Sequence, residues 1–184
     1  MFAIKLVVFG VVSLGLAYVS RASLLAPRSH GFYRFFAWEL ILVLALLNLE
    51  AWFRNPLSWY QIISWLLMMT SLFLVVHSAR LLQQFGKPDP RRNDAVMLAF
   101  EKTTTLVTDG AYRYIRHPLY SSLLLLAWGI FFKVPSGLGG LIASLATLFL
   151  ITTAKIEEAE DIRFFGKAYE EYMKRTRMLV PFLL

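Results

Sequence analysis

Long apolar stretches separated by short polar segments dominate this sequence. A helix needs about 20 apolar residues to cross the hydrocarbon core of a bilayer. Five stretches near or slightly below that length occur, at 2–20, 35–53, 57–79, 119–134 and 137–154. The pattern predicts an all-α integral membrane protein that forms one membrane domain over residues 1–184, with about five transmembrane helices.

The last two stretches are joined by the turn-forming sequence KVPSGLGG. Pro135 ends one helix and Gly137 releases the next, so this pair is expected to form a tight C-terminal helical hairpin. The first arm, 119–134, spans roughly 24 Å at 1.5 Å per residue, which is less than the ~30 Å core. We expect the polar RYIRHP segment before it to make up the missing length.

Composition supports a membrane protein and excludes several other classes. Hydrophobic residues make up 58% of the chain and charged residues only 17%, so a net charge of +7 is better explained by membrane topology than by nucleic-acid binding. The chain has no cysteine, which excludes disulfides and thiolate metal sites. His30, His77 and His117 lack metal-ligand spacing. We therefore expect neither a metal nor a nucleic-acid partner.

Basic residues fall on one side of the predicted bundle. The segments 21–34, 80–116 and 155–184 hold three, seven and six of the nineteen Lys and Arg residues. The opposite side keeps only Lys5, Arg54 and Lys133. By the positive-inside rule, the amino terminus lies outside, the carboxyl terminus lies in the cytoplasm, and 80–116 and 155–184 are cytoplasmic.

These two cytoplasmic segments are the expected place of function. The 37-residue segment 80–116 is too long for a simple connector between packed helices. Asn93 is a candidate cap for a short helix within it. The tail is expected to be helical to about Arg175, with Gly166 as an internal weak point.

Charged and aromatic side chains cluster where the fourth apolar stretch begins: Tyr112, Arg113, Tyr114 and Arg116 precede it, and Tyr120 is its second residue. They suit a topological role, with arginines as cytoplasmic anchors and tyrosines at the membrane interface. The His-Pro pair that follows the last arginine also suits a helix start.

An acidic pair favours a pocket over a simple interfacial belt. Glu157 and Glu158 come at the cytoplasmic end of the fifth stretch, so the hairpin returns them to the level of His117. Two polar clusters at one membrane depth indicate a binding pocket. Glu39, inside the second stretch, is accounted for by snorkelling or by pairing with Arg34.

The sequence LVTDGAYRYIRHPLY, the hairpin, the EE pair, FFGKAYEEYMKR and a late proline occur in this order. This arrangement resembles the isoprenylcysteine carboxyl methyltransferase family, part of a wider group of integral-membrane methyltransferases that includes phospholipid methyltransferases. The resemblance covers residues 104–181.

The resemblance implies S-adenosylmethionine as cofactor, bound in a cytoplasmic pocket. The positions that match its cofactor contacts are Thr104, Thr105, Leu106, Val107, Tyr112, His117, Pro118, Leu119, Tyr120 and Glu157. Candidate substrate contacts are Thr153, Glu158 and Arg116. No catalytic residue is assigned.

The methyl acceptor implied by the resemblance is lipophilic, either an isoprenylcysteine-like carboxylate or a lipid head group at the inner leaflet. Carboxyl-methylating relatives carry an arginine where this chain has Thr153, which puts the isoprenylcysteine acceptor in doubt. The acceptor is expected to enter from the bilayer through a gap lined by small residues, with Ser121, Ser122 and Ala127 as candidates.

Two other functions stay open. One is an NADPH-dependent membrane reductase of the sterol type, which would favour further arginines near the pocket. The other is a non-catalytic, lipid-binding membrane protein whose polar clusters serve only topology. A soluble Rossmann-type cofactor fold is not supported, because no G-x-G-x-x-G sequence occurs.

Overall fold

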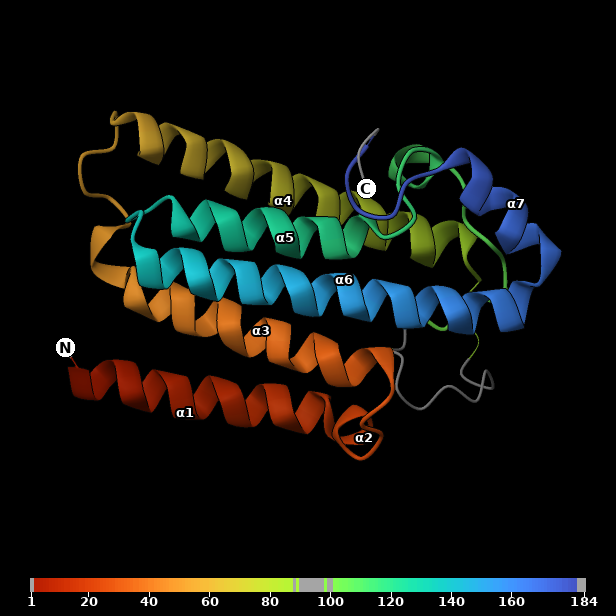
Figure 1. Cartoon of the computed structure of the whole chain (residues 1–184), viewed down its shortest axis with the longest axis horizontal. Helices are drawn as coiled ribbons and strands as arrows, with labels where there is room; N and C mark the ends of the chain where they lie inside the picture. Colours follow the sequence, from red (N-terminus) through yellow and green to blue (C-terminus); the bar gives the residue numbers. More distant parts are fainter. Residues whose placement is uncertain (1, 88, 90–97, 99–100, 182–184) are drawn as a thin grey trace.

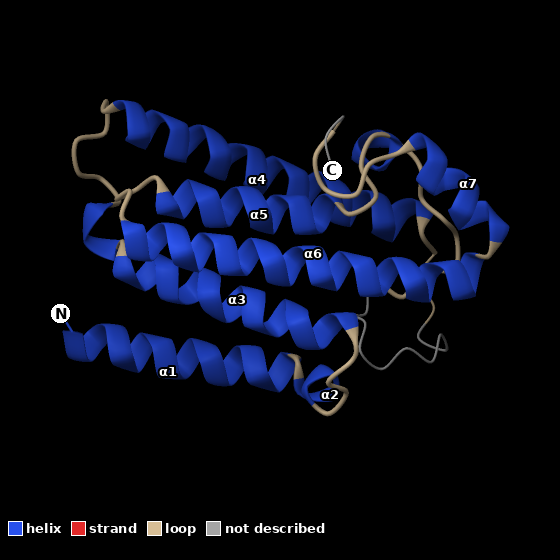
Figure 2. Ribbon diagram, in the orientation of Figure 1, coloured by secondary structure: helices blue, strands red, loops and turns tan. Residues whose placement is uncertain are grey.

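The computed structural model describes residues 2–87, 89, 98 and 101–181. Over these residues the protein is a bundle of helices that lie side by side (Figures 1 and 2). The elements in chain order are α1 (Phe2–Val19), α2 (Arg21–Leu24), α3 (His30–Leu47), η1 (Leu49–Ala51), α4 (Trp59–Phe85), η2 (Gly110–Arg113), α5 (Pro118–Phe131), α6 (Gly137–Phe165) and α7 (Lys167–Arg175). The predicted cap at Asn93 lies outside the described residues.

Four helices, α1, α3, α4 and α6, are long and apolar enough to cross a membrane. The fifth apolar helix, α5, has 14 residues and spans about 21 Å at 1.5 Å per residue. The predicted all-α membrane fold is therefore confirmed, with α5 as the short helix. Ser136 caps α6 by accepting a hydrogen bond from the Gly139 amide at 3.1 Å, so the hairpin also forms as predicted.

The second membrane helix lies earlier in the chain than the predicted 35–53. It begins at His30 because the Ser29 hydroxyl accepts a hydrogen bond from the Phe32 amide. It ends at Leu47. The next residue, Asn48, caps the helix, and its side-chain amide donates a hydrogen bond to the Ile130 carbonyl at 2.9 Å. Apolar length marks the part of a helix in hydrocarbon, whereas caps decide where it begins and ends.

Helix α6 continues well past the predicted boundary at residue 154 and reaches Phe165. Gly166 then adopts φ +60° and ψ −136°, a conformation open almost only to glycine, and α7 follows at once. The predicted weak point is therefore a true break between two helices. Because α6 extends beyond its apolar part, Glu157 and Glu158 stand on a regular helix.

Small side chains let the central helices pack closely. The main core joins α3, α5 and α6 and consists of Ile41, Leu44, Ala127, Ile130, Ile142, Ala143 and Ala146. At Gly129 a Cβ atom would lie 2.7 Å from the Met68 side chain, so glycine is what allows α5 to approach α4 there.

The expected lipid-facing gap is not found at the positions named for it. Ser121, Ser122 and Ala127 are 3%, 2% and 0% exposed, and the Ser122 carbonyl accepts a hydrogen bond from Ser71 on α4. This expectation was wrong because small residues on α5 serve close helix packing and face the protein interior.

Helix α1 lies at the edge of the bundle and has no buried residue. Two polar contacts tie it to its neighbours: the Ser13 hydroxyl donates to Glu39 at 2.6 Å, and Lys5 pairs with Glu50 at 3.0 Å. Glu39 is thus held by Ser13 of α1, whereas Arg34, one of the two explanations offered for Glu39, donates to Glu101.

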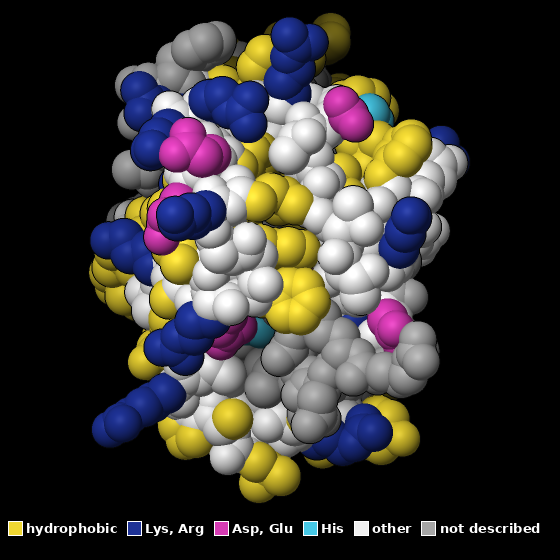
Figure 3. All heavy atoms as spheres, turned by 90° about the vertical axis from the view of Figure 1, so that its right-hand side faces the viewer, with side chains coloured by type: hydrophobic (Ala, Val, Ile, Leu, Met, Phe, Trp, Pro, Cys, Tyr) yellow, Lys and Arg dark blue, Asp and Glu magenta, His cyan; other side chains and the backbone are white. Residues whose placement is uncertain are grey.

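The predicted polar segments gather at one end of the bundle, where α2, α7 and the 101–117 segment lie (Figure 1). Figure 3 looks onto this end, and many Lys and Arg side chains cover it. Lys133 lies at the other end, where its ammonium contacts Gln61 at 3.0 Å and the Trp65 ring. The sidedness of the charges is as predicted, and the orientation across a membrane stays a prediction.

Candidate active site

The segment before α5 is held in place by the carboxyl-terminal tail. The Arg116 amide donates to the Arg177 carbonyl at 2.7 Å, and the His117 amide donates to the Met178 carbonyl at 3.1 Å. His117 is the residue before the first turn of α5, which Pro118 starts. The tail therefore fixes the position from which the His117 side chain projects.

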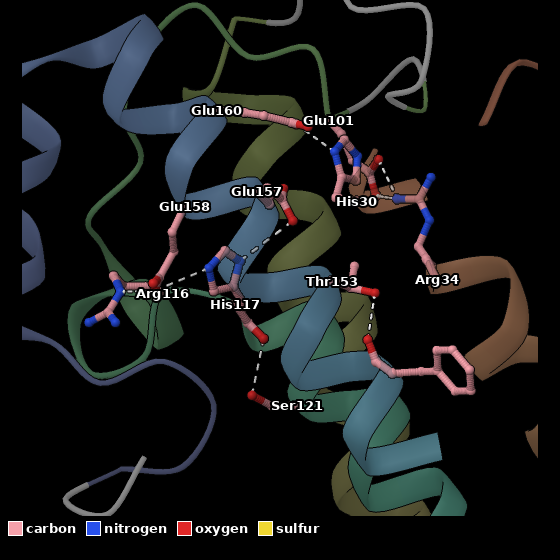
Figure 4. A network of polar contacts seen from close by, with 11 residues as sticks. His30, Arg34, Glu101, Arg116, His117, Ser121, Thr153, Glu157, Glu158 and Glu160 are labelled. Atoms are coloured by element: carbon pink, nitrogen blue, oxygen red, sulfur yellow. Dashed lines mark hydrogen bonds and ion pairs between the residues drawn. The ribbon is translucent and has the colours of Figure 1, made fainter. Parts of the chain in front are cut away.

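His117 lies between two glutamates of α6, Glu157 and Glu158. Its Nδ1 atom is 3.6 Å from Glu157 Oε2, and its Nε2 atom is 3.5 Å from Glu158 Oε1. Figure 4 shows the imidazole pointing from the start of α5 toward both carboxylates. The predicted convergence of His117 with the acidic pair is confirmed.

Arg116 and Glu158 form a separate, buried ion pair beside His117. The guanidinium Nε atom donates to Glu158 Oε1 at 2.6 Å, and each side chain is only 9% exposed. Arg116 also donates to the Thr176 carbonyl at 2.6 Å. This arginine is thus committed to holding α6 and the tail together.

A cavity of about 70 Å³ lies next to these contacts. Nine of the thirteen predicted site residues line it: Leu106, Val107, Tyr112, Arg116, His117, Pro118, Leu119, Tyr120 and Glu157. The sequence motifs therefore converge on one cavity, formed by α5, α6, α7 and the segment between α4 and α5.

Four predicted residues do not line the cavity. Thr104 and Thr105 are exposed, because both their amides bond to the Gly86 carbonyl at the end of α4 and turn the chain there. The Thr153 hydroxyl bonds to the Phe149 carbonyl of its own helix at 2.8 Å. Glu158 faces Arg116.

Helix α7 supplies aromatic lining that the sequence analysis missed. Tyr169 and Tyr172 are 2% and 3% exposed, and both line the cavity with Phe165. The Tyr172 hydroxyl donates to the Tyr112 carbonyl, and burial raises the pKa of the Tyr172 phenol. Tyr169 and Tyr172 lie three residues apart on α7 and therefore on one helical face, a signal that was present in the sequence, whereas Phe165 is the last residue of α6.

Further cavity residues come from α4, from the loop after it and from α6. Besides α7, the lining that the sequence analysis missed consists of Leu82, Glu101, Thr103 and Asp161. Glu101 is fixed by the Arg34 guanidinium, which donates to both of its carboxylate oxygens at 2.8 and 2.7 Å.

Helix α3 brings a second histidine to this end of the bundle. His30 Nδ1 lies 2.6 Å from Glu160 Oε2, and Figure 4 shows this pair and Arg34 beyond Glu157. The His30 side chain is only 1% exposed. The polar network therefore links α3, α6 and the start of α5. No sequence motif in α3 indicates this contact.

Three buried polar atoms of cavity-lining residues lack a hydrogen bond within the described part of the chain: His117 Nε2, the Tyr120 hydroxyl and Glu157 Oε2. Buried polar groups in proteins are almost always hydrogen-bonded, so each such group requires an explanation. Polar groups of a bound molecule would satisfy all three. These atoms make the cavity the candidate binding site of the protein.

The family model described as phospholipid methyltransferase matches residues 59–170. The match runs from the start of α4 into α7 and includes most of the cavity. This chain belongs to the phospholipid methyltransferase family. It is thus a member of a family of membrane methyltransferases.

Named relatives in this family methylate different groups. The chain is 28% identical to a methanethiol S-methyltransferase of Crocosphaera subtropica over 125 residues, which are 66% of this chain and 44% of the relative. It is 35% identical to a protein-S-isoprenylcysteine O-methyltransferase of Schizosaccharomyces pombe over 83 residues, 45% of this chain and 35% of the relative. The chain thus spans less than half the length of each.

Proposed function

We propose that this protein binds S-adenosylmethionine in the cavity between α5, α6 and α7 and transfers its methyl group to a lipophilic acceptor. The observation that carries the proposal is the set of three buried, unsatisfied polar atoms on His117, Tyr120 and Glu157. They lie within the part of the chain that matches a methyltransferase family.

The residues present suit the groups of this cofactor. Glu157 can accept hydrogen bonds from an ammonium or from ribose hydroxyls, and His117 can donate to a carboxylate. The faces of Tyr112, Tyr169 and Tyr172 favour a sulfonium as they favour other cations. The cavity volume of about 70 Å³ is smaller than the ~300–1,000 Å³ of typical ligand pockets, so we expect α7 to shift on binding.

When bound, the cofactor supplies an electrophilic methyl group on sulfur. The contribution of the chain is to hold donor and acceptor in line and to exclude water, which alone can provide a large rate enhancement. The buried tyrosines and the tail, which closes over the segment before α5, serve this exclusion.

The charges of the cavity favour an acceptor that is not a carboxylate. Arg116 is the one Lys or Arg among the described residues that line the cavity, and Glu158 already neutralises it at 2.6 Å. Thr153 is bonded to its own helix. An acceptor with a neutral reacting group, such as a thiol on an apolar molecule, therefore fits better than an isoprenylcysteine carboxylate.

The same charge pattern disfavours a sterol-type reductase. NADPH carries an additional phosphate, which arginines usually bind in two-point contacts. Arg116 is engaged by Glu158 and by the Thr176 carbonyl. If the polar cluster served only topology, the burial of polar atoms without hydrogen bonds on His117 and Glu157 would have no explanation.

Incubation of membranes that contain the protein with methyl-radiolabelled S-adenosylmethionine tests the proposal. Thiols of increasing chain length are added in parallel reactions, and label is counted in organic-solvent extracts. We expect extractable label that increases with acceptor apolarity and is absent with the Glu157→Gln variant. Label found only in water-soluble molecules or in protein would refute a lipophilic acceptor.

A further inference from the structure

A second concave surface lies on the polar end of the molecule and shares no residue with the catalytic cavity. It is lined by Arg113, Tyr114, Lys174, Arg175, Thr176, Arg177 and Pro181; we refer to these residues as the basic groove. Four of its seven members are cationic. None is acidic, so the groove favours an anion.

Backbone pairing fixes the two walls of the basic groove relative to each other. The Arg177 amide donates to the Tyr114 carbonyl at 3.0 Å, and Ile115 forms an isolated parallel bridge with Arg177. Arg113 on one wall and Arg175 on the other are therefore held on opposite sides of a preformed space. A preformed site loses little conformational entropy when it binds a ligand.

The cationic side chains of the basic groove make no strong ion pair within the described part of the chain. Lys174 pairs with Glu171 at 2.6 Å, and both side chains are highly exposed, so that pair is weak. Arg113, Arg175 and Arg177 are exposed, and no ion pair of theirs is found within the described part of the chain. Three guanidinium groups thus remain for an external anion.

The groove lies at the boundary between the apolar bundle and its polar end. Leu179, two residues after Arg177, is 1% exposed and packs in a core cluster with Tyr120 and Ala37. On the other wall, α5 enters the bundle at Pro118. Tyr114 is 55% exposed, as is common for tyrosines at a membrane interface. Phospholipid phosphates lie at this level of a bilayer.

We propose that the basic groove binds the phosphate of an anionic phospholipid in the adjacent leaflet. Guanidinium groups match a phosphate with two-point hydrogen bonds, and basic pockets at the membrane surface attract anionic lipids. A lipid bound there would hold the tail, and with it the roof of the catalytic cavity, against the membrane. The inference does not depend on methyl transfer.

The experiment compares lipid retention by native mass spectrometry. Detergent-purified protein is titrated with phosphatidylglycerol or with phosphatidylcholine of the same chains. The test variant is Arg113→Gln/Arg175→Gln/Arg177→Gln. The matched control, Lys155→Gln/Arg163→Gln/Lys167→Gln, removes three exposed cations of α6 and α7 outside the groove.

We expect the wild type and the control to prefer phosphatidylglycerol, and the groove variant to lose at least tenfold in affinity for it, about 1.4 kcal/mol. Affinity for phosphatidylcholine should be alike in all three proteins, which shows that the fold is intact. Equal losses in the groove and control variants, or no preference in the wild type, would overturn the proposal. Inorganic phosphate binding to lipid-free protein below millimolar concentration would identify a soluble anion as the occupant instead.

Discussion

His117 Nδ1 lies 3.6 Å from Glu157 Oε2, and this contact joins the residue before α5 to the polar end of α6. The distance is longer than a good hydrogen bond, and Glu157 Oε2 makes no hydrogen bond of good geometry among the described residues, although the Tyr120 phenol lies next to the Glu157 carboxylate. The two side chains are therefore close enough to share one ligand yet are not saturated by each other. This arrangement is the basis of the proposed cofactor site.

The buried Arg116–Glu158 pair should be essential for folding of the tail. Arg116→Gln leaves the Glu158 carboxylate buried without its partner, which typically costs about 3–5 kcal/mol. The double variant Arg116→Gln/Glu158→Gln should be more stable than the single one, because neither charge then remains unpaired. Denaturant unfolding in detergent measures both. A cost below 1 kcal/mol for the single variant would contradict this role.

Positions 110 and 166 both require glycine because of their backbone conformation, and position 110 also lacks space for a side chain. Both have positive φ, +59° and +60°, but a Cβ at Gly110 would also lie 2.6 Å from His77 Nε2, whereas nothing lies within 4 Å at Gly166. Gly110→Ala should therefore destabilise the protein more than Gly166→Ala, which is expected to cost about 1–3 kcal/mol through strain alone. The thermal unfolding midpoints of the two variants are compared with that of the wild type. Equal decreases would show that the His77 side chain moves aside at no cost in stability.

The helical membrane fold could be predicted because apolar length and the Pro135–Gly137 turn are local properties of the chain. The meeting of His117 with Glu157 was also predictable, since a hairpin returns its second arm to the level of its first. The partners of Arg34 and His30 were not, because nothing in α3 encodes which distant carboxylate it meets. Thr104 and Thr105 failed as cavity residues because their amides close a turn onto Gly86.

Tyr172 should make the protein sensitive to alkaline pH. Burial raises the pKa of its phenol, and burial likewise raises that of Tyr112. A pKa above the unfolded value near 10 means that the folded state holds these protons more tightly. Their contribution to stability is therefore complete below pH 10 and falls as pH rises through the folded pKa.

Tyr172→Phe tests this pH dependence. It removes the hydrogen bond to the Tyr112 carbonyl, at a cost of about 1 kcal/mol at neutral pH. It should also make stability decline less steeply between pH 10 and 12. The test is to measure the unfolding free energies of the wild type and the variant across that pH range. If both fall equally with pH, burial does not raise the pKa of the Tyr172 phenol.

The predicted membrane orientation can be tested by thiol labelling, because the chain has no cysteine of its own. Ser136 and Lys167 are both exposed and lie at opposite ends of the bundle. We expect Ser136→Cys to react with an impermeant reagent in intact cells and Lys167→Cys to react only after permeabilisation. The reverse pattern would place the amino terminus in the cytoplasm.

Direct binding of S-adenosylmethionine tests the central proposal. Calorimetry on detergent-purified protein should detect binding to the wild type. Glu157→Gln keeps the shape of the side chain and removes its charge, so it should weaken affinity at least tenfold, about 1.4 kcal/mol. Glu171→Gln serves as a matched control, because that carboxylate is largely exposed on α7, and it should bind as the wild type does. Equal affinity in the wild type and in a folded Glu157→Gln variant, or binding of NADPH in place of S-adenosylmethionine, would contradict the account.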